Sequence, residues 1–187
     1  IIKRKYNLSK NNYLLFLARL VPEKGAHYLI EAFKSIQTNM KLVIAGGSSH
    51  SSKYENELHE LARDDDRIIF TGFVEGNELS ELYSNAYIYI LPSDIEGLPI
   101  SLLEAMSYGN CSLVSDIPEN ADVIENLGYT FGKADVADLR EKIYQLLSLN
   151  EQIENIKQNV QTFVLSKYNW DDAAVKTLEV YNSFCSK

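Results

Sequence analysis

The sequence is poor in cysteine, proline and glycine, and it contains no long apolar run. Its 187 residues include two Cys, four Pro and nine Gly, a composition that excludes disulfide-rich, collagen-like and low-complexity proteins. The apolar run at residues 86–91 is far short of the roughly 20 residues that a bilayer-spanning helix needs. Residues 1–5 lack the order of a signal peptide, and Cys111 lies in an apolar stretch typical of a buried free thiol. We therefore expect a globular, cytoplasmic protein without a membrane span.

Acidic residues outnumber basic ones. Eighteen Lys and Arg against 26 Asp and Glu leave a net charge of −8. Such a surface repels nucleic acid as a whole, although a local group of cations can still bind a small anion. His27, His50 and His59 have no second His, Cys or carboxylate at the spacing of metal ligands. We expect them to be surface or packing residues, and we predict neither a metal site nor a cofactor.

Short apolar runs alternate with longer segments of helical period, which predicts a parallel sheet covered by helices. Strands are expected at residues 13–18, 41–45, 67–70, 87–91, 112–115 and 129–131. Helices are expected at residues 26–37, 53–63, 77–84, 100–108, 120–125 and 136–149. The predicted fold is α/β: a single Rossmann-like, doubly wound parallel sheet with helices on both faces, in one domain over residues 1–187 whose sheet core spans about residues 13–149.

A helical tail is expected over about residues 150–187, with helices at 151–166 and 170–184. It carries large aromatic residues, among them Trp170 and Tyr181. Such side chains either dock on the sheet of this domain or pack against another domain.

Ligands of doubly wound sheets bind at the carboxyl ends of the strands, so the strand-to-helix loops are the candidate site. The first such loop contains Arg19 and Lys24. A guanidinium grips phosphate oxygens bidentately and an ammonium adds a point charge, which suits a diphosphate. The alternative is a pair of solvated surface cations.

The next two loops carry Gly47 and the pair Phe73-Val74. A glycine lets the backbone approach a ligand, or it serves only a tight turn. Phe73 and Val74 either form an apolar wall for a nucleobase or, as composition rules favour, belong to the core. No G-x-G-x-x-G pattern occurs, which removes the main support for a nicotinamide or flavin dinucleotide.

The fourth loop is the most informative, because Glu96 precedes a predicted helix that contains Glu104. Pro99 suits the first turn of that helix, and the amides of Gly97 and Leu98 with the helix N-terminus form an anion site. Glu104 has apolar neighbours in sequence, and a carboxylate among apolar groups is costly unless it faces a cleft. In one arrangement of a bound ligand, Glu96 accepts hydrogen bonds from hydroxyl groups of a sugar and Glu104 accepts them from a ribose diol. The helix N-terminus, Arg19 and Lys24 then hold the diphosphate between the two glutamates. The alternative is an amphipathic helix whose glutamates face solvent.

Together these stretches resemble one known family. They are Arg19…Lys24-Gly25, Ile44-Ala45-Gly46-Gly47, Phe70-Thr71-Gly72-Phe73-Val74, Leu91-Pro92-Ser93 and Glu96-Gly97-Leu98-Pro99…Glu104-Ala105-Met106…Gly109. As an ordered set over about residues 13–149, they resemble the C-terminal, donor-binding domain of the retaining group 1 (family four) glycosyltransferases of GT-B fold. The chain departs from the family at Gly46-Gly47-Ser48-Ser49, where the glycine pattern is shifted, and at residues 110–114, which replace a Pro-Val-Val stretch.

The resemblance implies metal-independent transfer of a hexose from a UDP- or GDP-linked donor to a glycan or lipid-linked acceptor, with retention at the anomeric carbon, in polysaccharide biosynthesis. It also implies residue roles: Arg19 and Lys24 neutralise the diphosphate, Glu96 contacts the donor sugar, Glu104 holds the ribose, and Phe73 and Val74 border the base.

Enzymes of this family resemble one another in having two Rossmann-like domains, with the acceptor site on the N-terminal one. Only one such domain fits in 187 residues. We therefore expect the acceptor domain to be absent from this chain, the chain to be inactive alone, and any association with the inner face of a membrane to run through the absent domain. Two alternatives remain open: a module that binds nucleotide without turnover, and a fragment of a GT-B sugar-nucleotide epimerase.

Overall fold

The predicted α/β fold is confirmed by a computed structural model, which describes residues 1–47 and 52–185. Its sheet has six strands, all parallel, in the order β3-β2-β1-β4-β5-β6. The strands are β1 (Tyr13–Leu17), β2 (Lys41–Ala45), β3 (Ile68–Gly72), β4 (Ile88–Leu91), β5 (Ser112–Ser115) and β6 (Tyr129–Phe131). β3 extends beyond the predicted end at residue 70 because Gly72 still pairs with Ala45.

The helices agree with the predicted segments to within about three residues at each end. They are α2 (Ala26–Lys34), α3 (Ser52–Ala62), α4 (Gly76–Asn85), α5 (Ile100–Ser107), α6 (Pro118–Ile124), α7 (Val136–Leu146), α8 (Asn150–Lys167) and α9 (Trp170–Cys185). Two further elements were not predicted, the short helix α1 (Ile2–Tyr6) and the 3-10 turn η1 (Pro22–Lys24). Neither is long enough to display a hydrophobic period.

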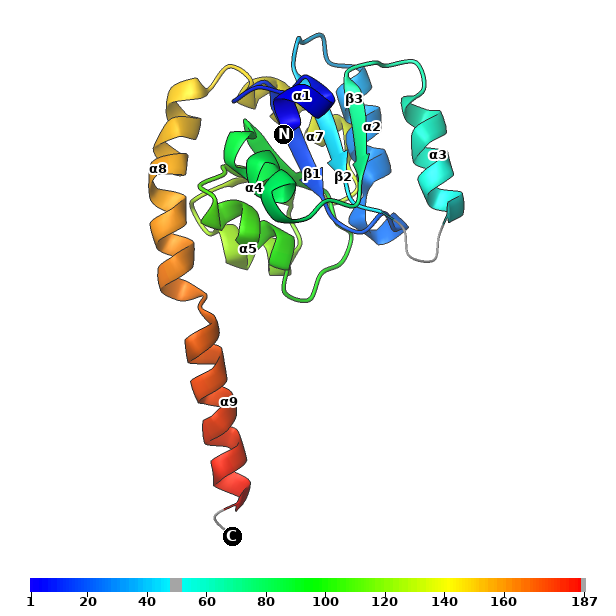
Figure 1. Ribbon diagram of the computed structural model, residues 1–187. Helices are drawn as coiled ribbons and strands as arrows, with labels where there is room; N and C mark the ends of the chain where they lie inside the picture. The colour runs from blue at the N-terminus through cyan, green and yellow to red at the C-terminus, as the bar shows by residue number, and fades with distance from the viewer. Residues whose placement is uncertain (48–51, 186–187) are drawn as a thin grey trace.

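Side chains of each strand alternate between two apolar layers, one on each face of the sheet. Leu14 and Phe16 of β1 pack with residues of α2, α3 and α7. Tyr13 and Leu15 pack with residues of α4, α5, α6 and α8. The helices therefore cover both faces of the sheet (Figure 1), and this burial explains why the strands read as continuous apolar runs.

The strand order places the candidate site. β1 pairs with β2 on one side and with β4 on the other, and the helices that follow β1 and β4 cover opposite faces of the sheet. The two connections separate at this topological switch point, and the carboxyl ends of strands at such a point are where doubly wound sheets bind ligands.

The two tail helices differ in their surroundings. α8 docks on the domain through the buried side chains of Ile153, Val160 and Val164. Residues 171–184 of α9 are all exposed, and the helix extends away from the body (Figure 1). Among the residues described, no helix combines the length and the apolar character needed to cross a bilayer.

Candidate active site

Lys24 and Glu96 form an ion pair between the first and fourth strand-to-helix connections. Lys24 lies at the end of η1, and its Nζ donates to Glu96 Oε1 at 2.6 Å. The side chains are 16% and 6% exposed, so the pair is partly shielded from solvent and its Coulomb attraction is screened less than that of a surface pair. Folding thus joins two of the predicted site residues.

Ser93 is a second donor to the same carboxylate oxygen. Its Oγ donates to Glu96 Oε1 at 2.6 Å. Glu96 Oε2 accepts no hydrogen bond from the described part of the chain. One oxygen of Glu96 is therefore held by protein donors, and the other remains available to a ligand hydroxyl.

The two connections are packed backbone against backbone. Gly25 has φ +70°, and a Cβ at this position would lie 2.0 Å from the carbonyl oxygen of Pro92. The Asp94 amide donates to the Glu23 carbonyl at 2.8 Å. Glycine is required at residue 25 both for its backbone conformation and for the close approach that brings Lys24 to Glu96.

Arg19 follows β1 and is exposed. Its side chain forms no hydrogen bond or ion pair with the described residues, so its charge is not neutralised there. It lies in the connection that also carries Lys24, where a second cation would add to the attraction for an anion.

The N-terminus of α5 lies at the end of the Glu96 loop. Pro99 is its N-cap, not a first-turn residue as predicted, because the helix begins one residue later and the amides of Leu102 and Leu103 donate to the Pro99 carbonyl. The amides of Gly97 and Leu98 form no hydrogen bond with the described residues, and both residues are exposed. They are therefore free to donate to an anion.

The loops after β2 and β3 complete the edge of the sheet. The Gly47 carbonyl accepts from the Leu20 amide at 3.2 Å, and the Gly46 amide donates to the Gly72 carbonyl at 2.9 Å. Phe73 is 78% exposed, contrary to the core position that composition favours, whereas Val74 is buried. An apolar wall at this edge would therefore come from the Phe73 ring. Ser48 and Ser49, which continue the glycine loop, lie outside the described residues.

Glu104 is exposed, on the face of α5 opposite to the buried Leu102, Ala105 and Met106. Its apolar sequence neighbours therefore do not surround it, because the helical period turns them toward the sheet. Tyr83 Oη donates to Glu104 Oε2 at 3.0 Å, and burial raises the pKa of Tyr83, which keeps this hydroxyl a donor. Tyr83 thus holds Glu104 from α4.

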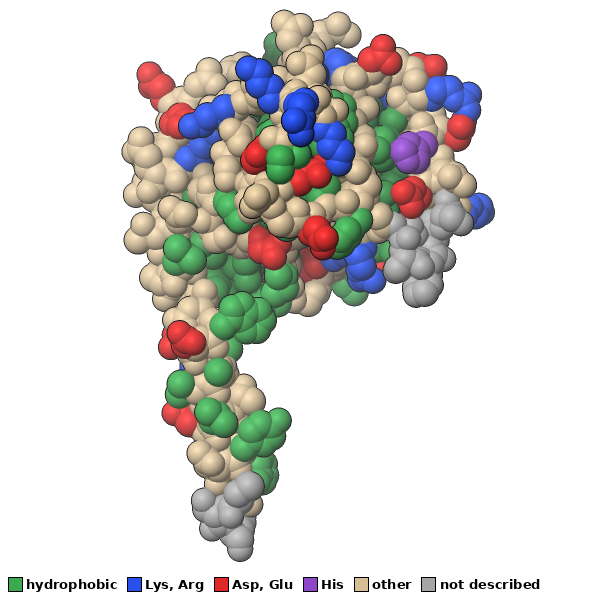
Figure 2. Space-filling view, viewed as in Figure 1, with side chains coloured by type: hydrophobic (Ala, Val, Ile, Leu, Met, Phe, Trp, Pro, Cys, Tyr) green, Lys and Arg blue, Asp and Glu red, His purple; other side chains and the backbone are tan. Residues whose placement is uncertain are grey.

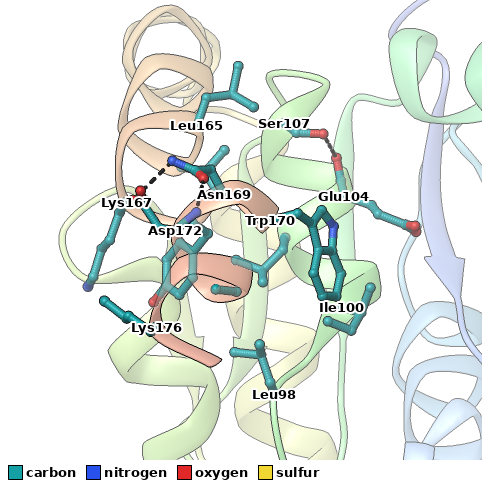
Figure 3. Close-up of a pocket in the computed structure, with 14 residues that line it drawn as sticks. Leu98, Ile100, Glu104, Ser107, Leu165, Lys167, Asn169, Trp170, Asp172 and Lys176 are labelled. Carbon is teal, nitrogen blue, oxygen red and sulfur yellow. Dashed lines mark hydrogen bonds between the residues drawn. The ribbon is translucent and has the colours of Figure 1, made fainter. Parts of the chain in front are cut away.

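An apolar groove of about 520 Å³ lies beside Glu104, between α5 and the tail helices. Leu98 and Ile100 line it from the start of α5 and the loop before it, Leu165 and Trp170 line it from α8 and α9, and the Trp170 ring lies next to Ile100 (Figure 3). Hydrophobic side chains continue from there along α9 (Figure 2). Neither Lys24 nor Glu96 lines this groove, so the groove is separate from the Lys24–Glu96 pair.

The histidines that can be placed make packing contacts. His27 Nδ1 lies 2.7 Å from the Tyr54 hydroxyl, and the His59 ring contacts the Phe70 ring in a tilted arrangement, with 4.0 Å between ring centroids. His50 lies outside the described residues. No cluster of three or more potential metal ligands occurs in residues 1–47 and 52–185.

The sequence analysis assigned no role to the polar residues that support Glu96, although Ser93 belongs to one of the stretches that carry the family resemblance. Ser93, Ser115 and Asn120 are fully buried and linked by hydrogen bonds. The sequence feature that could have identified them is a polar residue at a position where the hydrophobic pattern predicts the end of a buried strand or the connection that follows it.

Comparison with known proteins relates the chain to sugar-transferring enzymes. An uncharacterised glycosyltransferase of Methanocaldococcus jannaschii is 32% identical over 175 residues, which are 90% of this chain and 44% of that protein. The O-antigen chain mannosyltransferase B of Escherichia coli is 26% identical over 187 residues, 96% of this chain and 48% of that protein. The chain therefore spans about half the length of these curated relatives.

Solved structures agree in fold. The crystal structure of Anabaena HepE in complex with UDP-glucose superposes with a TM-score of 0.89 over 97% of this chain and 51% of that one, at 18% identity. The family model for glycosyl transferases group 1 matches residues 1–163. The chain belongs to the group 1 glycosyltransferases.

Proposed function

We propose that this chain is the donor-binding half of a retaining, metal-independent glycosyltransferase. It binds a UDP- or GDP-linked sugar at the carboxyl ends of β1 and β4, and the hexose passes to a glycan or lipid-linked acceptor held by a second domain. The observation that carries the proposal is the contact between Lys24 and Glu96, next in the chain to the amides of Gly97 and Leu98, which have no hydrogen-bond partner among the described residues.

The proposed chemistry is electrostatic. When the bond between the anomeric carbon and the diphosphate breaks, the electron pair passes to the diphosphate oxygen and negative charge accumulates there. Fixed donors and cations at that position lower the barrier. An ammonium has three N–H donors, so Lys24 can hold Glu96 with one and contact the diphosphate with another. Arg19 contributes a second cation in the same connection.

The two glutamates bind different parts of the donor, Glu96 the sugar and Glu104 the ribose. Glu96 Oε2, unused within the described residues, accepts a hydrogen bond from a hydroxyl of the donor sugar. Glu104, which Tyr83 holds, accepts from the ribose diol, and the exposed ring of Phe73 borders the base next to the Val74 backbone. Retention and independence of metal are expected of the family that the motifs resemble, and the coverage of about half of each relative supports a separate acceptor domain.

Calorimetry with UDP, GDP, UDP-glucose and GDP-mannose tests the diphosphate assignment. The wild-type chain should bind at least one nucleotide, and Arg19→Ala and Lys24→Ala should each weaken that binding by about tenfold, which corresponds to the loss of one charge-assisted hydrogen bond. Arg140→Ala is the matched control, because Arg140 is also exposed but lies on α7, outside these loops. Unchanged affinity in both site variants would show that the diphosphate lies elsewhere.

A further inference from the structure

Three of the buried polar residues form a hydrogen-bonded chain that leads to Glu96. Ser93, Ser115 and Asn120 each have an exposed fraction of 0%. Ser93 belongs to the loop that carries Glu96, Ser115 ends β5, and Asn120 lies in the first turns of α6. Buried polar groups carry a desolvation cost, so their hydrogen bonds are expected to determine the local geometry.

The peptide unit between Ser93 and Asp94 is held at both of its polar ends. Its carbonyl, on Ser93, accepts from Ser115 Oγ at 2.5 Å. Its amide, on Asp94, donates to the Glu23 carbonyl at 2.8 Å. β5 and the η1 connection thus fix this peptide from opposite directions, three residues before Glu96.

The direction of the hydrogen bonds follows from the atoms involved. A carbonyl only accepts, so the single proton of the Ser115 hydroxyl points to Ser93. The Asn120 atom that faces Ser115 Oγ, at 3.0 Å, must then be the donor Nδ2. Asn120 Oδ1 has no partner among the described residues, which is the cost of this orientation.

We propose that Ser115 and Asn120 are positioning residues for Glu96. Ser115 holds the carbonyl of Ser93, and Asn120 in turn holds the Ser115 hydroxyl. The Ser93 hydroxyl shares Glu96 Oε1 with Lys24. The chain of donors from α6 through β5 therefore determines which carboxylate oxygen is occupied and which one meets the donor sugar. This inference rests on the proposed function, in which Glu96 contacts that sugar.

A positioning role differs from a purely structural one in what it changes. If Ser115 only stabilised the fold, its loss would affect binding of the nucleotide and of the nucleotide sugar alike. If it positions Glu96, its loss weakens the contribution of the sugar and spares that of the nucleotide. The ratio of the two dissociation constants, nucleotide over nucleotide sugar, separates these cases.

The experiment compares Ser115→Ala with Ser112→Ala. Ser112 lies in the same strand and is equally buried, but its hydroxyl has no hydrogen-bond partner among the described residues. Dissociation constants are measured by calorimetry for UDP with UDP-glucose and for GDP with GDP-mannose. For the pair that binds, we expect Ser115→Ala to lower the ratio by about three- to tenfold, the effect of one lost or misplaced hydrogen bond. Nucleotide affinity should stay within about twofold, and Ser112→Ala should change neither value.

Each outcome has a distinct meaning. An unchanged ratio in folded Ser115→Ala, while the wild type binds, overturns the positioning role and leaves the proposed function intact. If Ser115→Ala does not fold, Asn120→Ala and Ser93→Ala replace it, and an unchanged ratio in both overturns the role. Absence of binding by the wild-type chain contradicts the proposed function, and the positioning role falls with it.

Discussion

Lys24 and Arg19 carry the same charge in one connection but have different surroundings. Lys24 is largely buried against a carboxylate that is 6% exposed, whereas Arg19 is exposed and has no side-chain partner among the described residues. Both are proposed to bind the diphosphate, but only Lys24 also supports the fold. Ligand binding and stability must therefore be measured separately for the two variants.

Lys24→Ala should lower the free energy of unfolding by about 1–3 kcal/mol, because it leaves the shielded Glu96 carboxylate without its cation. Arg19→Ala should change that free energy by less than about 0.5 kcal/mol, as expected for an exposed residue. Urea unfolding of the ligand-free proteins measures both values. Equal stabilities would contradict a structural role for the Lys24–Glu96 pair.

Gly25 and Gly72 offer a second residue-scale comparison, since both have φ near +70°. Gly72→Ala should cost about 1 kcal/mol of stability, the backbone strain alone, because, apart from its two chain neighbours, no described residue places an atom within 4 Å of the added Cβ. Gly25→Ala should cost about 3 kcal/mol or more, because its Cβ would meet the Pro92 carbonyl at 2.0 Å. Thermal unfolding of both variants checks this order, and a similar loss in the two would mean that the connections separate easily.

At the scale of elements, α5 illustrates what a sequence pattern can and cannot predict. Its apolar residues predict a helix packed on the sheet, and Leu102, Ala105 and Met106 are indeed buried. The pattern does not reveal that Glu104 is paired with Tyr83 of α4, because that contact depends on how two separate helices lie on the same face. The local sequence determines whether a helix forms, but it does not determine which other helices and strands that helix contacts.

α9 should be cleaved well before the rest of the chain. A helix of 16 residues is marginally stable in water without tertiary packing, and Trp170, Tyr181 and Phe184 are 80%, 64% and 76% exposed. Limited digestion with chymotrypsin, followed by mass spectrometry, should first release fragments cut after these residues. Buried aromatic residues such as Tyr13 and Tyr89 serve as internal controls. Survival of α9 for as long as the body would indicate that it docks on this domain.

For the whole molecule, the net charge opposes the binding of an anion, whereas cationic groups at one edge of the sheet favour it. The net charge of −8 disfavours anions at long range, but this repulsion is screened beyond about 10 Å at moderate salt. Close to the sheet edge, Arg19 has no side-chain partner among the described residues, and the amides of Gly97 and Leu98 form no hydrogen bond with them. The proposed anionic donor would meet these groups at short range, in spite of the net charge.

We expect the chain alone to bind a nucleotide sugar without transferring the sugar repeatedly, because the proposed acceptor site lies on a second domain. A thermal-shift assay should record a higher melting temperature with the nucleotide sugar, since a ligand of the folded state stabilises it. Parallel assays of hydrolysis and transfer should record no multiple turnovers. Sustained turnover by the isolated chain would mean that the catalytic apparatus is already complete.

The sequence was sufficient to predict the parallel sheet, the helices α2 to α9 and the loops that hold the candidate site, because hydrophobic period and loop composition are local properties. It did not reveal that Lys24 contacts Glu96, 72 residues away, or that Ser115 and Asn120 support the loop of Glu96. These contacts form only when separate strands align in one sheet and their connections pack together. The candidate residues could thus be named from local pattern, while their partners and exposure were decided by tertiary packing, because hydrogen bonds need atoms placed to within a few tenths of an ångström.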